Sequence, residues 1–499
     1  FLKSIFKSEN IEKWVFRSIL FSNIIILIVS LFQFSELPSL SVYDAYGING
    51  IQGHKNLLAS FVFLCLPFIL LGFLSHQHNV WKTLFLLVLF LETCMFFILK
   101  TRAVYVGLSV SILCFFVISL KWYRNHLKSF PFLKISAFLI LSFLFIAMLN
   151  FMKSDITPGI KSEVELRKGS NNERIQLLLK TKDLIESNSL KGVGAGNWQI
   201  EFASNGIGGI ENAETQNTTF QRPHNDFLWI WAETGIIGLI LILTFYTIIA
   251  VSVIRYFLQK SETSKDIKIL ILFSAFIGFL SVSFFDFPKE RIEHYLLFMA
   301  LIALLLKTAD IKFENLLTDK YFIVRTVIII LLIFNTLIGY YRTIGETYTK
   351  KMYVNRVQNH WPLLIKNCDK AKSIFYTLDP TSIPLDWYRG VANFTLSNNN
   401  EALKDFASAY KLNPFNFHIL NNLASAYETS GNHELAKRYY FEALRMNPEF
   451  DEARLNLFVI FYNEKSFKNC WDILKSCKQN SKRKLLYLQL LNKSNYVKN

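Results

Sequence analysis

Long apolar runs, separated by short polar and basic segments, fill the first two thirds of the chain. Nine of these runs are apolar for roughly 17 residues or more, which is long enough for a helix to cross the hydrocarbon core of a membrane. They lie near residues 15–34, 57–75, 83–99, 103–120, 131–151, 227–254, 267–285, 292–306 and 322–341. The pattern predicts an all-α, polytopic bundle with about nine membrane spans. Because the sequence does not begin with methionine, it leaves room for further helices upstream.

From about residue 361 the hydropathy falls and a period of 34 residues begins, marked by Asp379-Pro380, Asn413-Pro414 and Asn447-Pro448. Small and aromatic residues share this period, since Ala402, Phe406 and Ala409 correspond to Ala436, Tyr440 and Ala443. The pattern resembles the tetratricopeptide repeat, a helix pair in which small residues allow close helix crossing and proline ends the second helix. We therefore expect a transmembrane domain at residues 1–345 and a soluble α-solenoid tail at residues 346–499.

The net charge of +16 could indicate nucleic-acid binding, but the basic residues are dispersed at the ends of the predicted helices. In five consecutive connections they fall on one side of the membrane, which the positive-inside rule identifies as cytoplasmic. These residues are Lys3, Lys7, Lys13, Arg17, His76, His78, Lys82, Lys121, Arg124, Lys128, Arg255, Lys260, Lys265, Lys268, Lys307, Lys312 and Lys320. The long loop at 153–225 and the tail are then extracytoplasmic. We expect contact with membrane lipids and no nucleic-acid partner.

The six cysteines do not indicate a disulfide framework. Cys65, Cys94 and Cys114 lie inside predicted membrane helices, where they are ordinary packing residues. The other three, Cys368, Cys470 and Cys477, fall on the 34-residue lattice at the positions of Ala402, Ala436 and Ala443. We interpret them as small core residues.

The loop at 153–225 is too long for a simple connection between two membrane helices, so a functional segment is expected there. Its glycines, Gly192, Gly194 and Gly196, invite a phosphate-loop interpretation. That interpretation fails because no Gly-Lys-Ser/Thr follows, no strand precedes, and a nucleotide site would face the wrong compartment. Tight turns and close packing explain the glycines.

His224 stands at the end of this loop, directly before the apolar run that begins at Phe227. Backbone N–H groups at a helix start disfavour a charged imidazole, so His224 is a candidate proton acceptor. At 100° per residue it shares a face with Leu228, Trp231, Gly235 and Gly238, whose glycines would admit another helix. The alternative is an ordinary interfacial histidine. Glu233, deeper in the same run, requires a partner or a proton.

Several cations lie on the outer side of the predicted bundle, where topological bias does not call for them. They are Lys55 with its neighbours His54 and Asn56, then Arg102, Arg174, Arg222 and Arg291. An anionic ligand would explain them, because arginine presents paired donors to phosphate oxygens. Lipid headgroups and local carboxylates such as Glu290 and Glu293 are the alternative explanation.

Together these motifs resemble the O-antigen ligase and polymerase superfamily of polytopic glycosyltransferases. The resemblance is carried, in order, by Gly50-Ile51-Gln52-Gly53-His54-Lys55-Asn56, Lys100-Thr101-Arg102-Ala103, Arg174, Gly192-Val193-Gly194-Ala195-Gly196, and His224-Asn225 with Gly235-Ile236-Ile237-Gly238. It implies transfer of a glycan from undecaprenyl diphosphate to a hydroxyl of lipid A-core or of a protein, at the outer face of the bacterial inner membrane. It also implies a periplasmic tail, and it asks for no metal or other cofactor.

The resemblance assigns the catalytic arginine roles to Arg102 and Arg174, and the role of base or acceptor-orienting residue to His224. Substrate binding is expected at Lys55, His54, Asn56, Arg222 and Arg291, of which Arg222 and Arg291 rest mainly on their position. No Asp-x-Asp is present to hold a metal. Three further interpretations stay open: a polymerase joining lipid-linked repeat units, a transporter or export scaffold, and a protein partner bound by the repeats.

Overall fold

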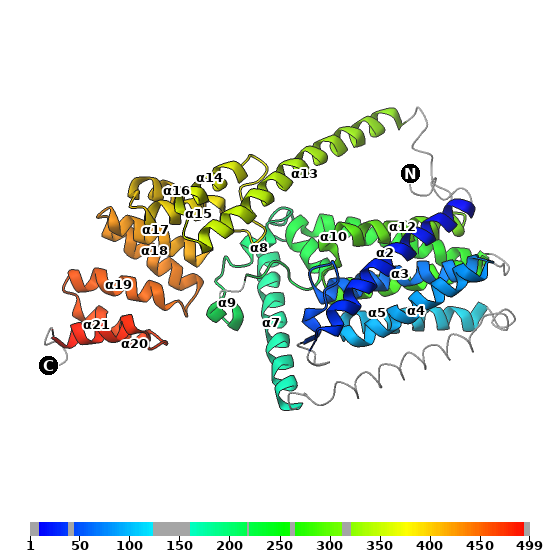
Figure 1. The fold of residues 1–499 in the computed structure, drawn as a ribbon, viewed down its shortest axis with the longest axis horizontal. Helices are drawn as coiled ribbons and strands as arrows, with labels where there is room; N and C mark the ends of the chain where they lie inside the picture. Colours follow the sequence, from blue (N-terminus) through cyan, green and yellow to red (C-terminus); the bar gives the residue numbers. More distant parts are fainter. Residues whose placement is uncertain are drawn as a thin grey trace. The chain divides into compact units, whose positions relative to one another are not determined.

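The computed structural model describes residues 9–37, 44–122, 160–216, 219–259, 265–311 and 321–493 (Figure 1). Within these ranges the regular elements are helices, with two isolated bridges, Ser373 to Tyr376 and Leu378 to Pro384. The all-α prediction is therefore confirmed. The chain packs as two compact units. The first, here the bundle unit, holds the described residues within Phe1–Arg174, Ser189–Gly192 and Arg222–Asn315; the repeat unit holds those within Ile175–Asn188, Val193–Gln221 and Leu316–Asn499.

Seven helices in the described ranges are long and apolar enough to cross a membrane, and each matches a predicted span. They are α2 (Glu9–Ser35), α3 (Lys55–Ser75), α4 (Asn79–Leu99), α5 (Arg102–Trp122), α10 (Asp226–Gln259), α11 (Asp266–Phe285) and α13 (Phe322–Val357). The predicted span at 292–306 is helix α12 (Ile292–Thr308), which has 17 residues. The predicted span at 131–151 lies outside the described residues. The chain is thus a multi-pass membrane protein.

Helix α3 is the central helix of the bundle unit, where it packs against α2, α4, α11 and α12. In its most apolar stretch 78% of the residues are buried, against 22% in the corresponding stretch of α10. Helix α10 therefore presents most of its apolar surface outward, as expected of a helix that faces lipid.

Helices α5 and α11 cross closely because each carries a glycine at the contact. A Cβ atom at Gly278 would lie 2.6 Å from the carbonyl oxygen of Gly107, so neither position accepts a side chain. Gly107 also faces Val282, which shows that the two helices run antiparallel. The start of α5, at Arg102, is therefore at the same end of this pair as Asp286, which follows α11.

Buried polar pairs link the bundle helices. Asn23 of α2 donates a hydrogen bond to Glu92 of α4, and both side chains are fully buried. At the end where α2 begins, the Arg17 guanidinium donates to His76 over 3.1 Å and lies 4.2 Å above the Trp81 ring. The carboxylate inside α4 thus has a hydrogen-bond donor, which is what a polar group at membrane depth requires.

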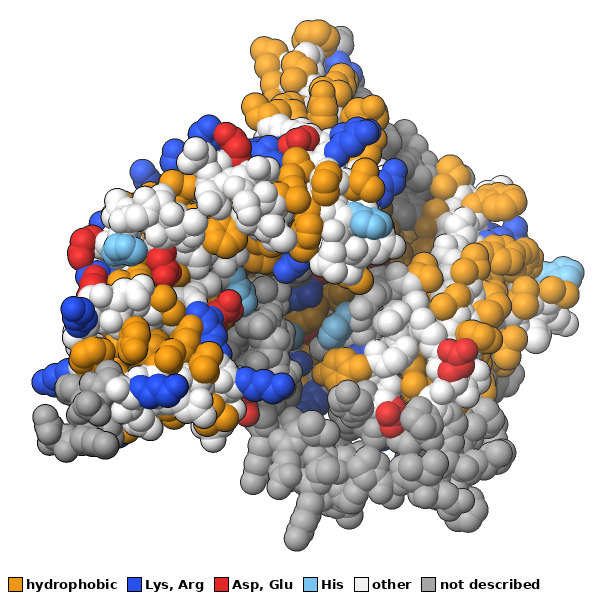
Figure 2. Space-filling view, turned by 60° about the vertical axis from the view of Figure 1, so that its left-hand side comes forward, with side chains coloured by type: hydrophobic (Ala, Val, Ile, Leu, Met, Phe, Trp, Pro, Cys, Tyr) orange, Lys and Arg blue, Asp and Glu red, His pale blue; other side chains and the backbone are white. Residues whose placement is uncertain are grey.

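Helix α13 joins the last predicted span to the repeats without a break. None of its most apolar 18-residue stretch is buried, whereas its second half packs on the first repeat helix. Gly345 lies against the Tyr376 ring, and Met352 meets the Cys368 thiol at 3.1 Å. In the surface view, hydrophobic side chains run along the membrane helices, and charged side chains of both signs dot the repeats (Figure 2).

The tail consists of helix pairs, as the 34-residue period predicts. After α13 come α14 (Trp361–Ala371), α15 (Leu385–Thr395), α16 (Asn399–Leu412), α17 (Phe417–Thr429), α18 (His433–Met446), α19 (Asp451–Asn463), α20 (Phe467–Ser476) and α21 (Lys482–Lys493). The repeated small and aromatic positions, Ala402, Phe406, Ala409, Ala436, Tyr440 and Ala443, are all 0–1% exposed. All six cysteines are free, and the three in the tail are buried, which confirms their interpretation as core residues.

The segment 193–221 packs against the repeats rather than projecting from the chain. It contains the short helices α8 (Trp198–Glu201) and α9 (Glu211–Gln216). The fully buried Trp198 donates its indole N–H to Thr181 of helix α7 (Ile160–Ser187) over 3.1 Å. The Ile207 amide donates to the Met446 carbonyl over 2.8 Å. One end of the long loop is therefore part of the repeat unit.

Candidate functional site

The Phe287 ring organises one end of the bundle unit. It is 1% exposed and follows α11, and three candidate side chains from other segments surround it. The imidazole of His224 meets it edge-on with ring centroids 4.7 Å apart, and that of His54 does so at 5.7 Å. The Arg222 guanidinium lies 4.4 Å above the ring. The structure thus brings together three of the residues that the sequence singled out, here called the Phe287 cluster.

His224 is held in an unusual backbone conformation just before α10. Its φ is 57°, a left-handed value that non-glycine residues rarely adopt, and its side chain is 19% exposed. Burial lowers the pKa of His224, the neighbouring Asp286 opposes that shift, and the charges of Arg174 and Arg222 add to it. The ring is therefore neutral near pH 7. From the sequence, we expected the helix start to keep His224 neutral, but burial is the main cause of its lowered pKa.

Asp286 is the carboxylate closest to His224, with 3.9 Å between its Oδ1 and Nδ1 of the imidazole. It is 2% exposed, and Asn56 directs its amide N–H at the same Oδ1 over 3.5 Å. Asn56, one of the predicted binding residues, thus lies beside Asp286, to which the sequence analysis assigned no role. The available signal was a carboxylate directly at the end of an apolar helix, where an unpaired charge is costly.

Arg222 and Arg291 share one carboxylate. Arg222 forms an ion pair with Glu290, and the guanidinium of Arg291 lies 3.9 Å from the same side chain. Arg291 also donates to the carbonyl of Gln52 over 3.0 Å. Burial, together with the charge of Arg291, lowers the pKa of Arg222 to about 10. Glu290 therefore balances one of the two arginines, and the charge of Asp286 also acts on Arg222.

His54 and Lys55 stand at the start of α3. His54 caps the helix by accepting the Asn56 amide at 3.1 Å, and burial lowers its pKa to about 4. The Lys55 ammonium lies 4.1 Å above the ring of Tyr46, in the short helix η1 (Asp44–Gly47). A neutral His54 accepts a hydrogen bond here and adds no charge, so Lys55 is the cation of this segment.

Glu233 has the partner that its depth in the membrane helix requires. The Lys289 ammonium, in the short helix η4 (Pro288–Glu290), lies 3.4 Å from Glu233 and 4.0 Å above the Trp229 ring. Its backbone N–H donates to Asp226 over 3.0 Å. Lys289 thus ties the segment after α11 to α10, a role that the sequence did not reveal because the two segments are more than 50 residues apart.

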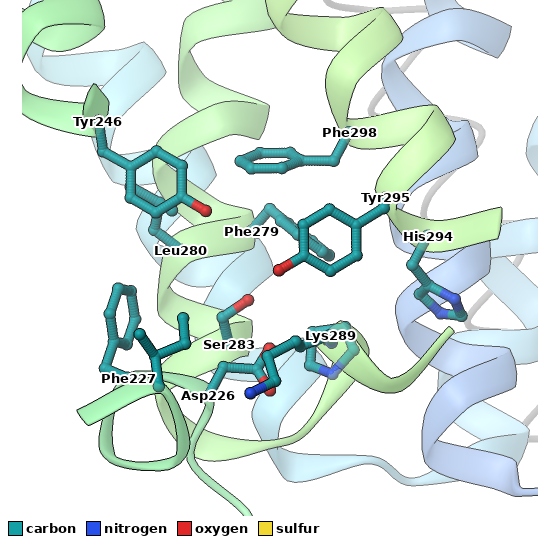
Figure 3. A pocket seen from close by; sticks show the side chains of 12 residues that line it. Asp226, Phe227, Tyr246, Phe279, Leu280, Ser283, Lys289, His294, Tyr295 and Phe298 are labelled. Atoms are coloured by element: carbon teal, nitrogen blue, oxygen red, sulfur yellow. Dashed lines mark hydrogen bonds between the residues drawn. The ribbon is translucent and has the colours of Figure 1, made fainter. Parts of the chain in front are cut away.

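A small cavity lies beside this contact, with the hydroxyls of Tyr246 and Tyr295 pointing into it (Figure 3). Its volume is about 20 Å³. That is room for about one water molecule. The cavity is too small for a sugar or a lipid chain.

A glycine of α10, Gly235, allows a close backbone contact. Gly235 has φ 69° and ψ −176°, and a Cβ there would lie 2.1 Å from the carbonyl oxygen of Leu190. A Cβ at Gly192 would similarly lie 2.4 Å from the backbone of Glu233. The expectation that Gly235 and Gly238 admit another helix is wrong in detail. Gly235 admits the turn 189–192, and a Cβ at Gly238 would meet only Thr234 of its own helix among the described residues. The amide of Ile236 donates to Ser189 in that turn over 2.8 Å.

The two arginines that are expected to be catalytic lie at the start of α5 and within α7. Arg174 is half-buried in α7, and its charge acts on His224. Arg102 begins α5 directly after Lys100 and Thr101, where Lys100 takes a left-handed conformation with φ 49°, and its side chain is exposed. The roles of both arginines remain predictions.

Two family models match the chain, one in the membrane-spanning part and one in the repeats. Residues 84–243 match a family model described as O-antigen ligase, and residues 417–450 match a tetratricopeptide repeat. No curated protein matches the sequence. Among solved structures, the crystal structure of MamA is similar over 32% of this chain and 90% of its own, with 18% identity and a TM-score of 0.24.

The fold and the two family-model matches define a class: a multi-pass membrane protein with a glycosyltransferase-like domain and a tail of tetratricopeptide repeats. Within that class, residues 84–243 are similar to the O-antigen ligase family, whose model they match. The resemblance stated from the sequence motifs is therefore confirmed. A lipid-linked glycan is the substrate class that this family implies.

Proposed function

We propose that the protein transfers a glycan from undecaprenyl diphosphate to an acceptor hydroxyl, of lipid A-core or of a protein, at the outer face of the bacterial inner membrane. One observation carries this proposal. A neutral histidine, His224, lies beside the buried carboxylate of Asp286 and next to Arg222, which shares Glu290 with Arg291. The distribution of basic residues supports an orientation in which this end of the bundle and the tail face the periplasm.

The chemistry asks for a base and for cations. In the transfer, the acceptor oxygen attacks the anomeric carbon, the bond from that carbon to the diphosphate oxygen breaks, and the acceptor proton passes to His224. Asp286 then stabilises the imidazolium that forms. The departing diphosphate gains negative charge, which Arg222 and Arg291 are positioned to stabilise, with Arg102, Arg174 and Lys55 as further candidates.

Reconstitution in lipid with a lipid-linked glycan and separate acceptors tests the proposal. His224→Ala should reduce transfer by about 10²–10⁴-fold, the usual contribution of a general base. Arg102→Ala and Arg174→Ala should also abolish transfer while the protein still inserts. The matched control is His360→Ala, because His360 is exposed and its side chain makes no cap hydrogen bond. Normal transfer by all three site variants would overturn the mechanism.

The products distinguish the alternatives. Sugar on lipid A-core or on a protein supports a ligase, whereas longer lipid-linked chains alone would identify a polymerase and refute the ligase assignment. Passage of the lipid-linked glycan across the bilayer without transfer would identify a transporter. Protease accessibility of the tail in spheroplasts tests the orientation, and full protection of the tail would refute it.

The pH dependence of transfer provides a second test. Since the folded-state pKa of His224 is lowered from 6.5, the ring stays neutral down to lower pH, and the acid limb of the rate profile should lie below pH 6.5. Asp286 raises that pKa, so Asp286→Asn should move the acid limb to still lower pH. Arg174 lowers it, so Arg174→Gln should move the limb upward in whatever transfer remains. Identical acid limbs in all three proteins would exclude His224 as the titrating base.

A further inference from the structure

The repeat unit contains a cavity that neither the bundle nor the proposed reaction uses. One wall comes from the segment 193–221, and the other comes from α15, α17 and the turns before them. Its volume is about 480 Å³. Pockets for small ligands typically measure about 300–1,000 Å³. The cavity is thus large enough for a ligand, in contrast to the water-sized cavity beside Lys289.

The wall formed by segment 193–221 is fixed to the repeats by direct hydrogen bonds. Besides the Ile207 contact, the amide of Asn447 donates to the Glu214 carbonyl over 3.2 Å, and that of Gln221 donates to the Pro380 carbonyl over 2.7 Å. Gly206 allows the closest approach, since a Cβ there would lie 2.8 Å from the carbonyl oxygen of Arg445. Both walls of the cavity therefore belong to this chain, and these hydrogen bonds hold the two walls together.

Aromatic side chains form a quarter of the lining, five of its twenty residues, Phe202 among them. Trp387, Phe415, Phe417 and Phe220 offer flat apolar faces. Trp387 is 7% exposed, and its indole N–H is buried with no hydrogen-bond partner among the described residues. Because this N–H has almost no accessible surface, Trp387 contributes apolar ring surface to the lining and no donor.

The polar side chains of the lining carry little net charge. Arg356 and Glu452 contribute one charge of each sign, and the guanidinium of Arg356 lies 5.0 Å above the Trp387 ring. Burial, reinforced by the charge of Arg356, lowers the pKa of His418 to about 4, so this imidazole is neutral near pH 7. The cavity therefore fits an uncharged ligand that has both apolar faces and hydrogen-bonding groups.

We propose that this cavity binds a sugar unit of the transferred glycan. A pyranose ring presents C–H faces that stack on aromatic rings, and its hydroxyls both donate and accept hydrogen bonds. An extended peptide is less favoured, because the chain's own segment 193–221 already occupies one side of the groove. The same segment continues directly from Phe220 and Gln221 into Arg222 and His224. This inference rests on the proposed function and assigns it a second glycan contact.

The test measures binding without turnover. The probe is the oligosaccharide released by mild acid from the lipid-linked glycan of the producing cell, titrated calorimetrically into full-length His224→Ala protein in lipid nanodiscs. Ala203 lines the cavity, so adding Ala203→Trp should fill it and weaken binding at least tenfold. The matched control is Asn205→Trp in the same segment, because Asn205 is exposed and does not line the cavity.

Three results would overturn the inference: no binding by the parent protein, equal binding by the Ala203→Trp variant, or saturation of the cavity by tryptic peptides instead of the oligosaccharide. An unchanged elution volume and melting curve would show that Ala203→Trp is folded. The inference and the proposed function can fail separately. If the protein transfers glycan but does not bind the oligosaccharide, only the inference is contradicted. If the protein transfers no glycan but binds the oligosaccharide, and Ala203→Trp abolishes that binding, the cavity is supported and the proposed reaction is contradicted.

Discussion

The bundle unit and the repeat unit both bring helices together over small residues, but they place those residues differently. In the bundle, Gly107 and Gly278 form an isolated contact between α5 and α11. In the repeats, Ala402 and Ala436 occupy equivalent positions one period apart, and both are fully buried. In water, burial of apolar surface drives each helix pair together, so a repeated pattern is sufficient. Lipid provides no such drive, and each membrane contact depends on its own residues.

Buried polar groups show the same difference. In the repeat unit Asp379 accepts hydrogen bonds from the Thr381 and Ile383 amides and from the hydroxyls of Tyr353 and Tyr388, at 2.6–2.9 Å. In the bundle, Asn23 provides Glu92 with one donor. The repeat unit satisfies its buried carboxylate locally and densely. The bundle uses its few polar pairs to join helices that are distant in the sequence.

The largest effect is expected where the bundle depends on a single glycine. Gly235→Val would force a branched side chain into a conformation that only glycine adopts readily, at a cost of about 1–3 kcal/mol before the overlap with Leu190 is counted. The turn 189–192 would have to leave α10. Since α10 also carries Glu233, the partner of Lys289, we expect transfer to fall by at least about tenfold, a barrier change of ~1.4 kcal/mol.

Gly339→Val in α13 is the matched control, because no atom lies within 4 Å of a Cβ built there. Transfer by reconstituted protein and thermal unfolding in detergent measure both variants. Equal transfer and equal unfolding of the two variants would show that the turn 189–192 does not depend on Gly235. Contacts in the bundle would then not depend on particular glycines.

A smaller effect is expected in the repeats, where equivalent packing contacts recur in each period. Ala402→Leu adds three heavy atoms to a fully buried site and should lower the stability of the tail by about 1–3 kcal/mol, the usual cost of overpacking. Limited proteolysis of the tail and its melting temperature would report the change. Lys404→Leu on the same helix should be close to neutral, because the Lys404 side chain is 71% exposed. A variant Ala402→Leu as resistant as the parent protein would contradict the role of the lattice in setting helix distance.

The same comparison explains what the sequence could predict. The period of the tail predicts its helix pairs and the burial of residues such as Phe406 and Tyr440, because every repeat solves the same packing problem. The membrane helices follow from hydropathy and length. The docking of segment 193–221 on the repeats leaves no such pattern, since its contacts to Met446 and Asn447 are single backbone or amide hydrogen bonds between distant residues.

For the candidate site, the sequence pointed to the histidines and arginines more readily than to the side chains beside them. His224, Arg222 and His54 were predicted from chemistry and position, and all three surround Phe287. Asp286 and Lys289 were missed as functional residues. Each acts through a residue from a different helix, and only the folded bundle places those residues beside one another.

The smallest effect is expected at the tail cysteines. Alanine is the natural replacement for them, because other repeats carry it at the equivalent positions. Cys368, Cys470 and Cys477 occupy positions where other repeats carry alanine, and all three are buried and free. Each substitution by alanine removes one sulfur atom, so it should change the free energy of unfolding by about 1 kcal/mol or less, comparable with the loss of one methyl group. The triple variant should transfer glycan at the parent rate, and dithiothreitol should change neither protein. A melting temperature that falls only when reductant is added to the parent would reveal a disulfide, and would show that the lattice does not account for these cysteines.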